Sequence, residues 1–263
     1  MTARTDALFW DAHWQRYELP RRVDLRSYFA YRCDRMFRSV VPRTTTGRFI
    51  DVGAGLGQWL IYFREVFGYE VVGVDNSPKA CELARRNVAL AGIDADVVCA
   101  DIMSAPIDEL SFDVVYSGGL VEHFDDPMPI IQRMSDLVKP GGLHIVSVPN
   151  LDSFYWRIRR RLNPAVEREH RKITPDMLRR MLVHAGMTDV TINYFGSVRL
   201  PHVRRRGVSG PGPDVSPPVW LAMRSVDRGL TTLFRLLDVH PEGTRLSQQI
   251  VGIGRAAKGR EVS

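Results

Sequence analysis

The sequence predicts an α/β domain in which a parallel sheet is covered by helices on both faces. Short apolar runs typical of strands alternate with helix-length segments between residues 49 and 148, and this alternation is typical of parallel strands joined by crossover helices. Glycine or a polar residue follows each of four strands, so these residues should meet at one edge of the sheet. With 263 residues, 44% hydrophobic and 25% charged, the chain can bury one sizeable core.

The segment before the first strand is predicted to be helical from residue 6 to about residue 40. Trp10, Trp14 and Tyr17 stand at positions i, i+4 and i+7, which places them on one face of a helix. Residues 42–47 contain proline, threonine and glycine, so they are expected to form a turn that leads into the first strand.

The first core strand runs into a glycine-rich turn that precedes a helix. Gly53, Gly55 and Gly57 follow this strand, which carries Asp51. The alternating glycines let the backbone adopt positive φ and leave no Cβ between it and a ligand. Dinucleotide-binding folds space their glycines as G-x-G-x-x-G, whereas the third glycine comes one residue earlier here. The turn is therefore expected to contact a ligand that is not a pyrophosphate.

Three further strands end in polar residues or glycine. The second strand, residues 69–75, ends in Asp75, which follows Asp51 by 24 positions. A carboxylate at this place can accept hydrogen bonds from both hydroxyls of a ribose. The other two expected strands, with the residues that follow them, are 95–99 with Asp101, and 112–116 with Ser117 and Gly118.

The remaining elements are expected from helix-starting prolines, helix-ending glycines and alternating apolar patterns. Helices are predicted over residues 58–67, 78–91, 127–138, 174–185 and 219–238. A fifth strand should end at Pro149, an insertion should occupy 150–173, further strands should span 187–195 and 249–254, and 199–218 should be a loop. The helix at 219–238 carries a long apolar stripe, so something should cover it.

The acid-x-G-x-G-x-G turn and the strand ends after it resemble class I methyltransferases that use S-adenosylmethionine. The resemblance covers roughly residues 48–195. It implies a Rossmann-like seven-stranded sheet with helices on both faces, whose last strand is antiparallel at the sheet edge. It also implies that S-adenosylhomocysteine is a product. The cofactor-binding residues that the resemblance implies are Asp51, Gly53, Ala54, Gly55, Gly57, Asp75, Asn76, Asp101, Ile102, Ser117 and Gly118.

The resemblance also implies a role for several of these residues. Asp75 would bind the cofactor ribose. Asp101 would bind the adenine amino group, with Ile102 packed on the adenine ring. Ser117 and Gly118 would lie beside the methionine part of the cofactor.

The segment after the fourth strand, residues 120–126, is similar to the type 11 branch of these enzymes. This branch includes ubiquinone-type O-methyltransferases and enzymes that modify sugars, lipids and secondary metabolites. In some members an earlier glutamate joins a Glu-His pair to hold a divalent metal. Here the pair is Glu122 and His123, but Gly119 stands where the earlier glutamate would be. No metal is therefore predicted.

Two histidines are candidate general bases. Neutral imidazole is well suited to take a hydroxyl proton near pH 7, and His123 follows the fourth strand. An alternative role for His123 is to cap the helix that follows it. His170 is the second candidate, because related enzymes often place a histidine between the insertion and the next helix.

The predicted methyl acceptor is a hydroxyl, less readily an amine, on a small molecule, a sugar or glycan, or a lipid-linked compound. The Asp/Asn-Pro-Pro-aromatic run typical of methylation of base amines is absent, and no cysteine follows the fourth strand for cytosine C5 chemistry. Between residues 151 and 206, 13 basic residues stand against five acids, which would suit an anionic acceptor. RNA methylation and a non-catalytic, cofactor-binding partner protein are the alternatives, although no nucleic-acid partner is expected.

The sequence divides into four expected parts: an N-terminal helical cap (1–47), the cofactor-binding core (48–198), a linker with an amphipathic helix (199–240), and the final strand and tail (241–263). The aromatic face of the cap either closes the cofactor site, as in related methyltransferases, or only packs on the sheet. The amphipathic helix is expected to form a substrate lid. A dimer interface and docking on an anionic membrane are the alternatives, so a monomer or a homodimer is expected.

The cysteines and the apolar runs predict where the protein resides. Its three cysteines lie far apart without C-x-x-C spacing, which indicates a reducing compartment. No apolar run approaches the roughly 20 residues of a membrane span, and no signal-peptide pattern is present. A cytoplasmic protein with at most peripheral membrane contact is expected.

Overall fold

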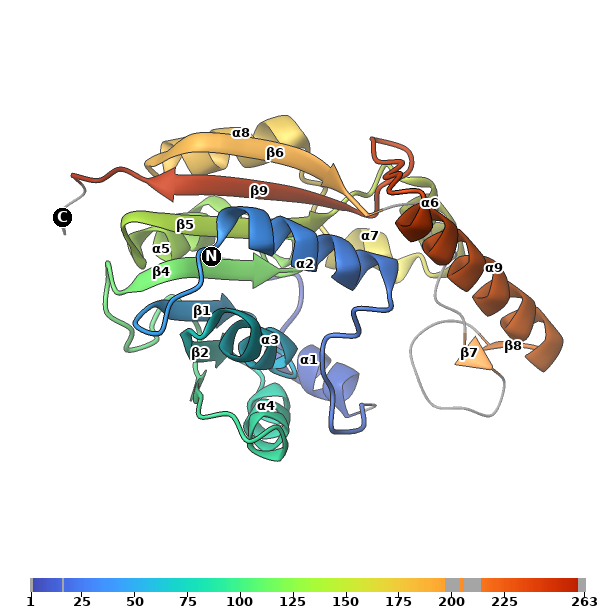
Figure 1. Cartoon of the computed structure of the whole chain (residues 1–263), viewed down its shortest axis with the longest axis horizontal. Helices are drawn as coiled ribbons and strands as arrows, with labels where there is room; N and C mark the ends of the chain where they lie inside the picture. Colours follow the sequence, from blue (N-terminus) through green and yellow to red (C-terminus); the bar gives the residue numbers. More distant parts are fainter. Residues whose placement is uncertain (1, 16, 197–203, 206–213, 260–263) are drawn as a thin grey trace.

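The protein is built on one seven-stranded sheet (Figure 1). The structure is a computed structural model, and it describes residues 2–15, 17–196, 204–205 and 214–259. The strand order in the sheet is β3-β2-β1-β4-β5-β9-β6. The strands are β1 (Arg48–Val52), β2 (Glu70–Asp75), β3 (Asp96–Cys99), β4 (Phe112–Gly118), β5 (Val138–Pro149), β6 (Met187–Phe195) and β9 (Gln249–Ala256). The predicted α/β, Rossmann-like sheet is confirmed.

Strand β9 is antiparallel to both of its neighbours, whereas β1 to β5 are parallel to one another. The predicted direction of the last strand is confirmed, but its predicted position at the sheet edge is wrong. β9 pairs with β5 along one side and with β6 along the other. Both of its sides are therefore hydrogen-bonded, and β6 is the edge strand.

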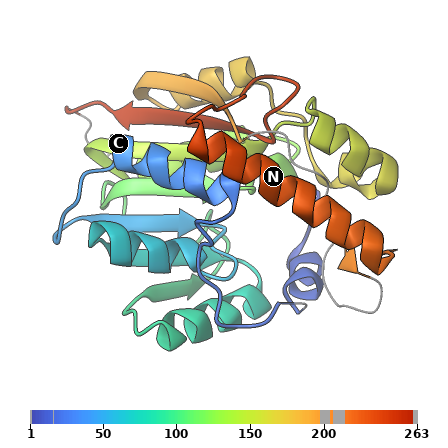
Figure 2. The same cartoon turned by 45° about the vertical axis from the view of Figure 1, so that its right-hand side comes forward.

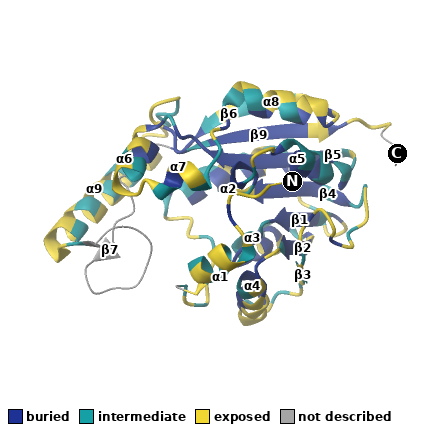
Figure 3. Cartoon of the chain, turned by 180° about the vertical axis from the view of Figure 1, so that it is seen from behind, coloured by how far each residue is buried: buried dark blue, intermediate teal, exposed yellow. Residues whose placement is uncertain are grey.

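Helices cover both faces of the sheet, and its central strands are buried between them (Figures 1 and 3). Successive side chains of a strand point to opposite faces. Phe49 packs on the face covered by helices α2 and α3, and its ring stacks on Phe63 at 3.7 Å between centroids. Ile50 belongs to the core on the other face, which α5 and α8 cover. These helices are α2 (Tyr28–Val40), α3 (Gln58–Phe67), α5 (Met128–Asp136) and α8 (Pro175–His184).

Side-chain caps fix where two of the helices begin. Ser77 Oγ accepts a hydrogen bond from the Ala80 amide at 3.0 Å at the start of α4 (Pro78–Leu90), and Thr174 caps α8 in the same way. The predicted end of α5 near residue 138 is wrong, because α5 ends at Asp136. Val138 already pairs with Phe112 as part of β5, so it cannot remain helical.

The N-terminal segment forms two helices, and the prediction of continuous helix from 6 to about 40 is wrong. Helix α1 (Ala7–Trp14) ends before Pro20, and α2 begins after Ser27. Proline has no amide hydrogen to donate within a helix. Ser27 Oγ accepts a hydrogen bond from the Ala30 amide at 3.3 Å, so a new helix starts there. Tyr17 consequently lies outside the helix that carries Trp10 and Trp14.

The insertions after β5 and β6 contribute further helices. They are α6 (Phe154–Leu162), α7 (Ala165–Glu169) and α9 (Pro217–Leu236), together with the two-residue strands β7 (Arg204–Arg205) and β8 (Asp214–Val215). Most of the predicted loop at 199–218 lies outside the described residues. No helix in the described part of the chain is long and apolar enough to cross a membrane.

Helix α9 lies beside α2 (Figure 2). The rings of Phe234 and Tyr28 are 5.7 Å apart between centroids, and the Arg235 guanidinium donates a hydrogen bond to the Leu25 carbonyl. Just after α9, Arg32 of α2 donates two hydrogen bonds to Glu242, at 2.8 and 2.9 Å. These contacts hold the C-terminal end of α9 against the N-terminal part of the chain.

Candidate active site

The glycine turn between β1 and α3 has the conformation that its sequence predicts. Gly53, Gly55 and Gly57 have φ of 81°, 54° and 68°, a region that side-chain-bearing residues rarely adopt. The amides of Gly53 and Ala54 donate hydrogen bonds to the Val74 carbonyl, at 2.8 and 3.1 Å. The turn is thus tied to the end of β2, next to Asp75.

Asp75 holds the turn from the other side. One carboxylate oxygen accepts a hydrogen bond from the Gly55 amide and the other from the Ser77 amide, both at 2.9 Å. Each carboxylate oxygen can accept a second hydrogen bond, so the side chain retains capacity for a ligand. Burial raises the pKa of Asp75, and these hydrogen bonds oppose that increase.

Asp51 is a buried acid on β1, just before the glycine turn, and 2% of its surface is exposed. Burial, and to a lesser degree the nearby charge of Asp75, raises its pKa to about 8. In the ligand-free chain this carboxyl is therefore mostly protonated at neutral pH. A cation placed beside it would favour the ionised form.

The strand ends border a cavity of about 1790 Å³. Most of the predicted cofactor-binding residues line this cavity: Asp51, Gly53, Ala54, Gly55, Asp75, Asn76, Asp101, Ile102 and Gly118. Ser117 and Gly57 are not among the lining residues. The Ser117 hydroxyl donates a hydrogen bond to the Val52 carbonyl at 2.9 Å and so connects β4 to β1. Gly57 precedes α3, and its role is to adopt the left-handed backbone conformation that the turn requires at this position.

Helix α1 covers the glycine turn through Trp14. The ring of Trp14 lies against Gly55, where an added Cβ would be 2.8 Å from the indole. Asp11, also on α1, accepts hydrogen bonds from the Ser77 hydroxyl at 2.5 Å and from the Lys79 amide at 3.0 Å. Both hydrogen bonds lower the pKa of Asp11, and the one from Ser77 has the larger effect. Residues of the predicted cap thus lie over the predicted cofactor site.

Helix α9 supplies part of the cavity wall. Trp220, Met223, Arg224, Asp227 and Arg228 all line it. The sequence predicts that the apolar stripe of this helix needs a partner, but it predicts no site residue on the helix. Asp11 is not predicted either, because no motif surrounds that residue and its partner Ser77 is 66 positions away.

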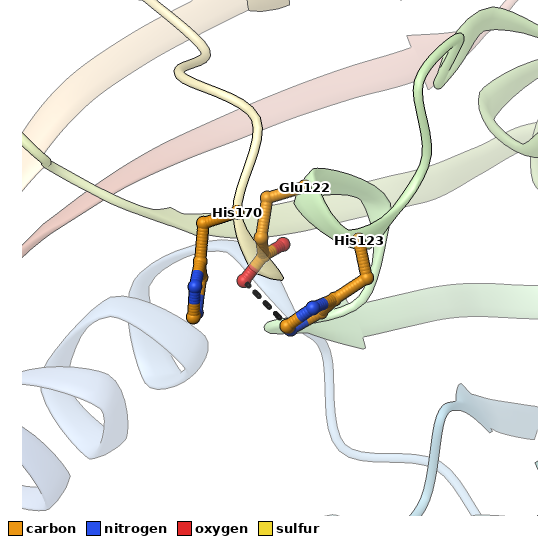
Figure 4. A group of neighbouring side chains, drawn as sticks. All are labelled: Glu122, His123 and His170. Carbon is orange, nitrogen blue, oxygen red and sulfur yellow. Dashed lines mark ion pairs between the residues drawn. The ribbon is translucent and has the colours of Figure 1, made fainter. Parts of the chain in front are cut away.

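The buried Glu122 and His123 and the half-buried His170 meet in a cluster next to the cavity (Figure 4). The first two belong to the short helix η1 (Val121–His123), and His170 follows α7. His123 Nε2 is 3.9 Å from Glu122 Oε1, and the two imidazole rings are 4.6 Å apart between centroids. Burial lowers the pKa of His123 to about 3 and that of His170 to about 4, whereas it raises the pKa of Glu122 to about 8.

The two histidines do not appear among the described residues that line the cavity. Trp10 of α1 lies on His123 with an edge contact of 4.9 Å between ring centroids, and Trp156 lies 5.3 Å from His170. The alternative prediction that His123 caps the next helix is wrong. Its Nδ1 is 2.8 Å from the Glu169 carbonyl oxygen, and no side chain caps α5.

The sheet order, the glycine turn and the acids at the strand ends define the fold of class I S-adenosylmethionine-dependent methyltransferases. Residues 50–146 match the family described as a methyltransferase domain. The chain is a member of this class of methyltransferases, and its cofactor is S-adenosylmethionine.

Two curated relatives with similar sequences have names that refer to quinones. A demethylmenaquinone methyltransferase of Shouchella clausii is 28% identical over 206 residues, which cover 69% of this chain and 87% of the relative. A ubiquinone biosynthesis O-methyltransferase of Cereibacter sphaeroides is 31% identical over 153 residues, which cover 54% of this chain and 61% of the relative. This chain therefore spans about three fifths of the length of the ubiquinone relative.

Solved structures share the fold. A methyltransferase from Archaeoglobus fulgidus is 21% identical with a TM-score of 0.55, covering 84% of this chain and 91% of that one. A phosphoethanolamine N-methyltransferase of Haemonchus contortus, in complex with S-adenosylhomocysteine, is 16% identical with a TM-score of 0.58. The match covers 86% of this chain and 52% of that one. At these identities the similarity concerns the fold alone.

Proposed function

We propose that the enzyme transfers the methyl group of S-adenosylmethionine to a hydroxyl of a phenol- or quinol-type acceptor with an apolar, lipid-like tail. The observation that carries this proposal is the size and lining of the cavity. Its volume of about 1790 Å³ exceeds the roughly 300–1,000 Å³ typical of a pocket for one small ligand. The space beyond the glycine turn is therefore available to an acceptor.

The wall that α9 provides indicates the chemistry of that acceptor. Trp220 and Met223 offer apolar surface, whereas Arg224 and Arg228 offer positive charge on the same side of the helix. An acceptor with an apolar body and a polar or anionic ring substituent would match both features. The names of two relatives, which refer to demethylmenaquinone and to ubiquinone biosynthesis, agree with this class.

We propose that the cofactor occupies the part of the cavity bordered by the strand ends. Asp75 would accept hydrogen bonds from the ribose hydroxyls with its remaining lone pairs. Asp101 and Ile102 would bind the adenine, and the turn at 53–55 would lie along the methionine part. Asp51 would become ionised beside the positive charges of the cofactor.

The reaction is an in-line displacement at the methyl carbon. A bond forms between the acceptor oxygen and the methyl carbon while the carbon–sulfur bond breaks, so the sulfonium becomes a neutral thioether and the hydroxyl proton must leave. Alignment of the two reactants can supply much of the rate enhancement. His123 and His170 remain predicted bases, but Trp10 covers one of them and burial makes both weakly basic. We therefore propose that alignment contributes more than these histidines do.

A panel of acceptors tests the proposal. Purified protein with S-adenosylmethionine should release S-adenosylhomocysteine with polyprenylated phenols and quinols, and more slowly with the same rings lacking the tail. Turnover only with amines, sugars or a short RNA would contradict the proposed acceptor class. Cofactor binding without turnover on any acceptor would favour the non-catalytic alternative.

A further inference from the structure

We propose that Glu122, His123 and His170 bind one divalent transition metal ion of the zinc class. Each residue offers one ligand atom, and these atoms all lie within 4.8 Å of one another. Figure 4 shows the three side chains directed toward a common point from two different segments of the chain. The proposal concerns a metal site that is separate from the cofactor contacts and does not depend on the identity of the acceptor.

Both imidazoles are oriented for coordination. The Nδ1–H of His123 donates to the Glu169 carbonyl at 2.8 Å, and that of His170 donates to the Val166 carbonyl at 3.0 Å. In this tautomer each Nε2 carries a free lone pair. A carbonyl that accepts from the second ring nitrogen is the arrangement that commonly supports metal-binding histidines.

The carboxylate of Glu122 supplies the independent evidence. The residue is only 2% exposed, and its Oε2 has no hydrogen-bond partner within the described part of the chain. A buried oxygen without a partner is unfavourable, because it has lost its hydrogen bonds to water and gained none in the protein. A cation bound between Glu122 and the two Nε2 atoms would satisfy it.

The surrounding backbone fixes the geometry of the cluster. The Arg171 amide donates to the Glu122 carbonyl at 2.6 Å, and the Arg4 amide donates to the His123 carbonyl at 2.7 Å. The segment that carries His170 is thus tied directly to η1. A small contraction would suffice for binding, because ligands at about 2.0–2.2 Å from a tetrahedral zinc ion are roughly 3.3 Å apart.

The donor set also indicates which metal is preferred. Two imidazoles and one carboxylate suit zinc and similar first-row ions, whereas magnesium prefers oxygen ligands. No metal is predicted from the sequence, because Gly119 provides no carboxylate. A Cβ at Gly119 would lie 3.6 Å from Glu122 Oε1, so that side of the carboxylate is open. His170 supplies the third ligand from a different part of the chain.

Metal binding by the purified, chelator-treated protein tests the proposal. Zinc and cobalt should each bind with a stoichiometry of one per chain by calorimetry and elemental analysis. Cobalt should give the visible absorption of a coordinated ion, and magnesium should bind at least about 100-fold more weakly. His170→Gln and Glu122→Gln should each weaken zinc binding more than about tenfold.

His184→Gln is the matched control, because His184 is exposed on α8 and should not change zinc binding. Circular dichroism and S-adenosylmethionine affinity establish that each variant is folded. If a variant does not fold, the melting temperature of the wild-type protein provides the test: zinc should raise this temperature and magnesium should not. Absence of stoichiometric zinc in the wild type, equal zinc affinity of His170→Gln, or a preference for magnesium would each overturn the proposal.

Discussion

The two sides of the cavity are held in place by different kinds of contact. On the cofactor side, the glycine turn and Asp75 are joined by backbone amides within about 20 residues of each other, as the bond between Gly55 and Asp75 shows. On the opposite side, α1 and α9 are held by side chains far apart in sequence, such as Asp11 with Ser77 and Phe234 with Tyr28. The cofactor side is therefore held by contacts between segments that are close in sequence, whereas the opposite side depends on tertiary contacts between distant segments.

The strongest test of the cofactor side is Asp75→Ala. The loss of a charged acceptor for two ribose hydroxyls, each worth about 1.5–3 kcal/mol, should weaken S-adenosylmethionine binding at least about tenfold. Calorimetry measures the affinity, and circular dichroism shows whether the variant is folded. Asp94→Ala, at an exposed position before β3, is the control. Unchanged affinity in a folded Asp75→Ala variant would remove Asp75 from the site.

The contact between Gly55 and Trp14 joins the two sides and can be broken from either one. Gly55→Ala introduces a Cβ at positive φ and 2.8 Å from the indole. It should destabilise the protein by about 1–2 kcal/mol from the backbone and about 1–3 kcal/mol from overpacking. Gly92→Ala also has positive φ, but nothing lies within 4 Å of its Cβ, so only the backbone effect should remain.

A double-mutant cycle with Trp14→Ala separates these two contributions. If Trp14 limits the space at Gly55, Gly55→Ala should be less destabilising in the Trp14→Ala background than in the wild type. Chemical denaturation measures all four proteins. Equal effects of Gly55→Ala in both backgrounds would show that α1 does not press on the turn.

These contrasts explain how much of the molecule the sequence predicts. Helix 58–67 depends on a local pattern and has its predicted bounds. Most of the residues predicted at the strand ends also follow local patterns and line the cavity, with Ser117 as an exception. The break between α1 and α2 follows from local signals, Pro20 and the Ser27 cap, which the predicted continuous helix did not take into account. The interior position of β9 depends on the distant strands that pair with it. The place of His170 beside His123 also depends on a distant contact. The neighbouring Glu169, whose carbonyl accepts a hydrogen bond from His123, follows His123 by 46 positions.

The opposite side of the cavity should respond to Phe234→Ala. This change removes the ring contact that holds α9 against Tyr28. Because small displacements of positioning groups reduce rates, kcat/KM for the acceptor should fall by about tenfold, while S-adenosylmethionine affinity stays the same. Leu221→Ala, with 61% of the residue exposed, is the control on the outer surface.

This variant also separates the lid from its alternatives. Light scattering should show a monomer for both Phe234→Ala and the wild type. A wild-type dimer would favour the interface alternative, and salt-sensitive binding to anionic vesicles would favour membrane docking. A loss of cofactor affinity in Phe234→Ala would contradict the division of the cavity into two sides.

The smallest predicted effect is a proton released from Asp51 when the cofactor binds. Its pKa of about 8 in the ligand-free chain means that it carries a proton at pH 7. The cationic cofactor favours the carboxylate and therefore lowers this pKa. Binding at pH 7 should release a proton, up to one per cofactor, and the release should decline as the pH rises above 8. Calorimetry in buffers of different ionisation enthalpy measures the release. Asp51→Asn should abolish it, whereas equal release from that variant would assign the proton to another group.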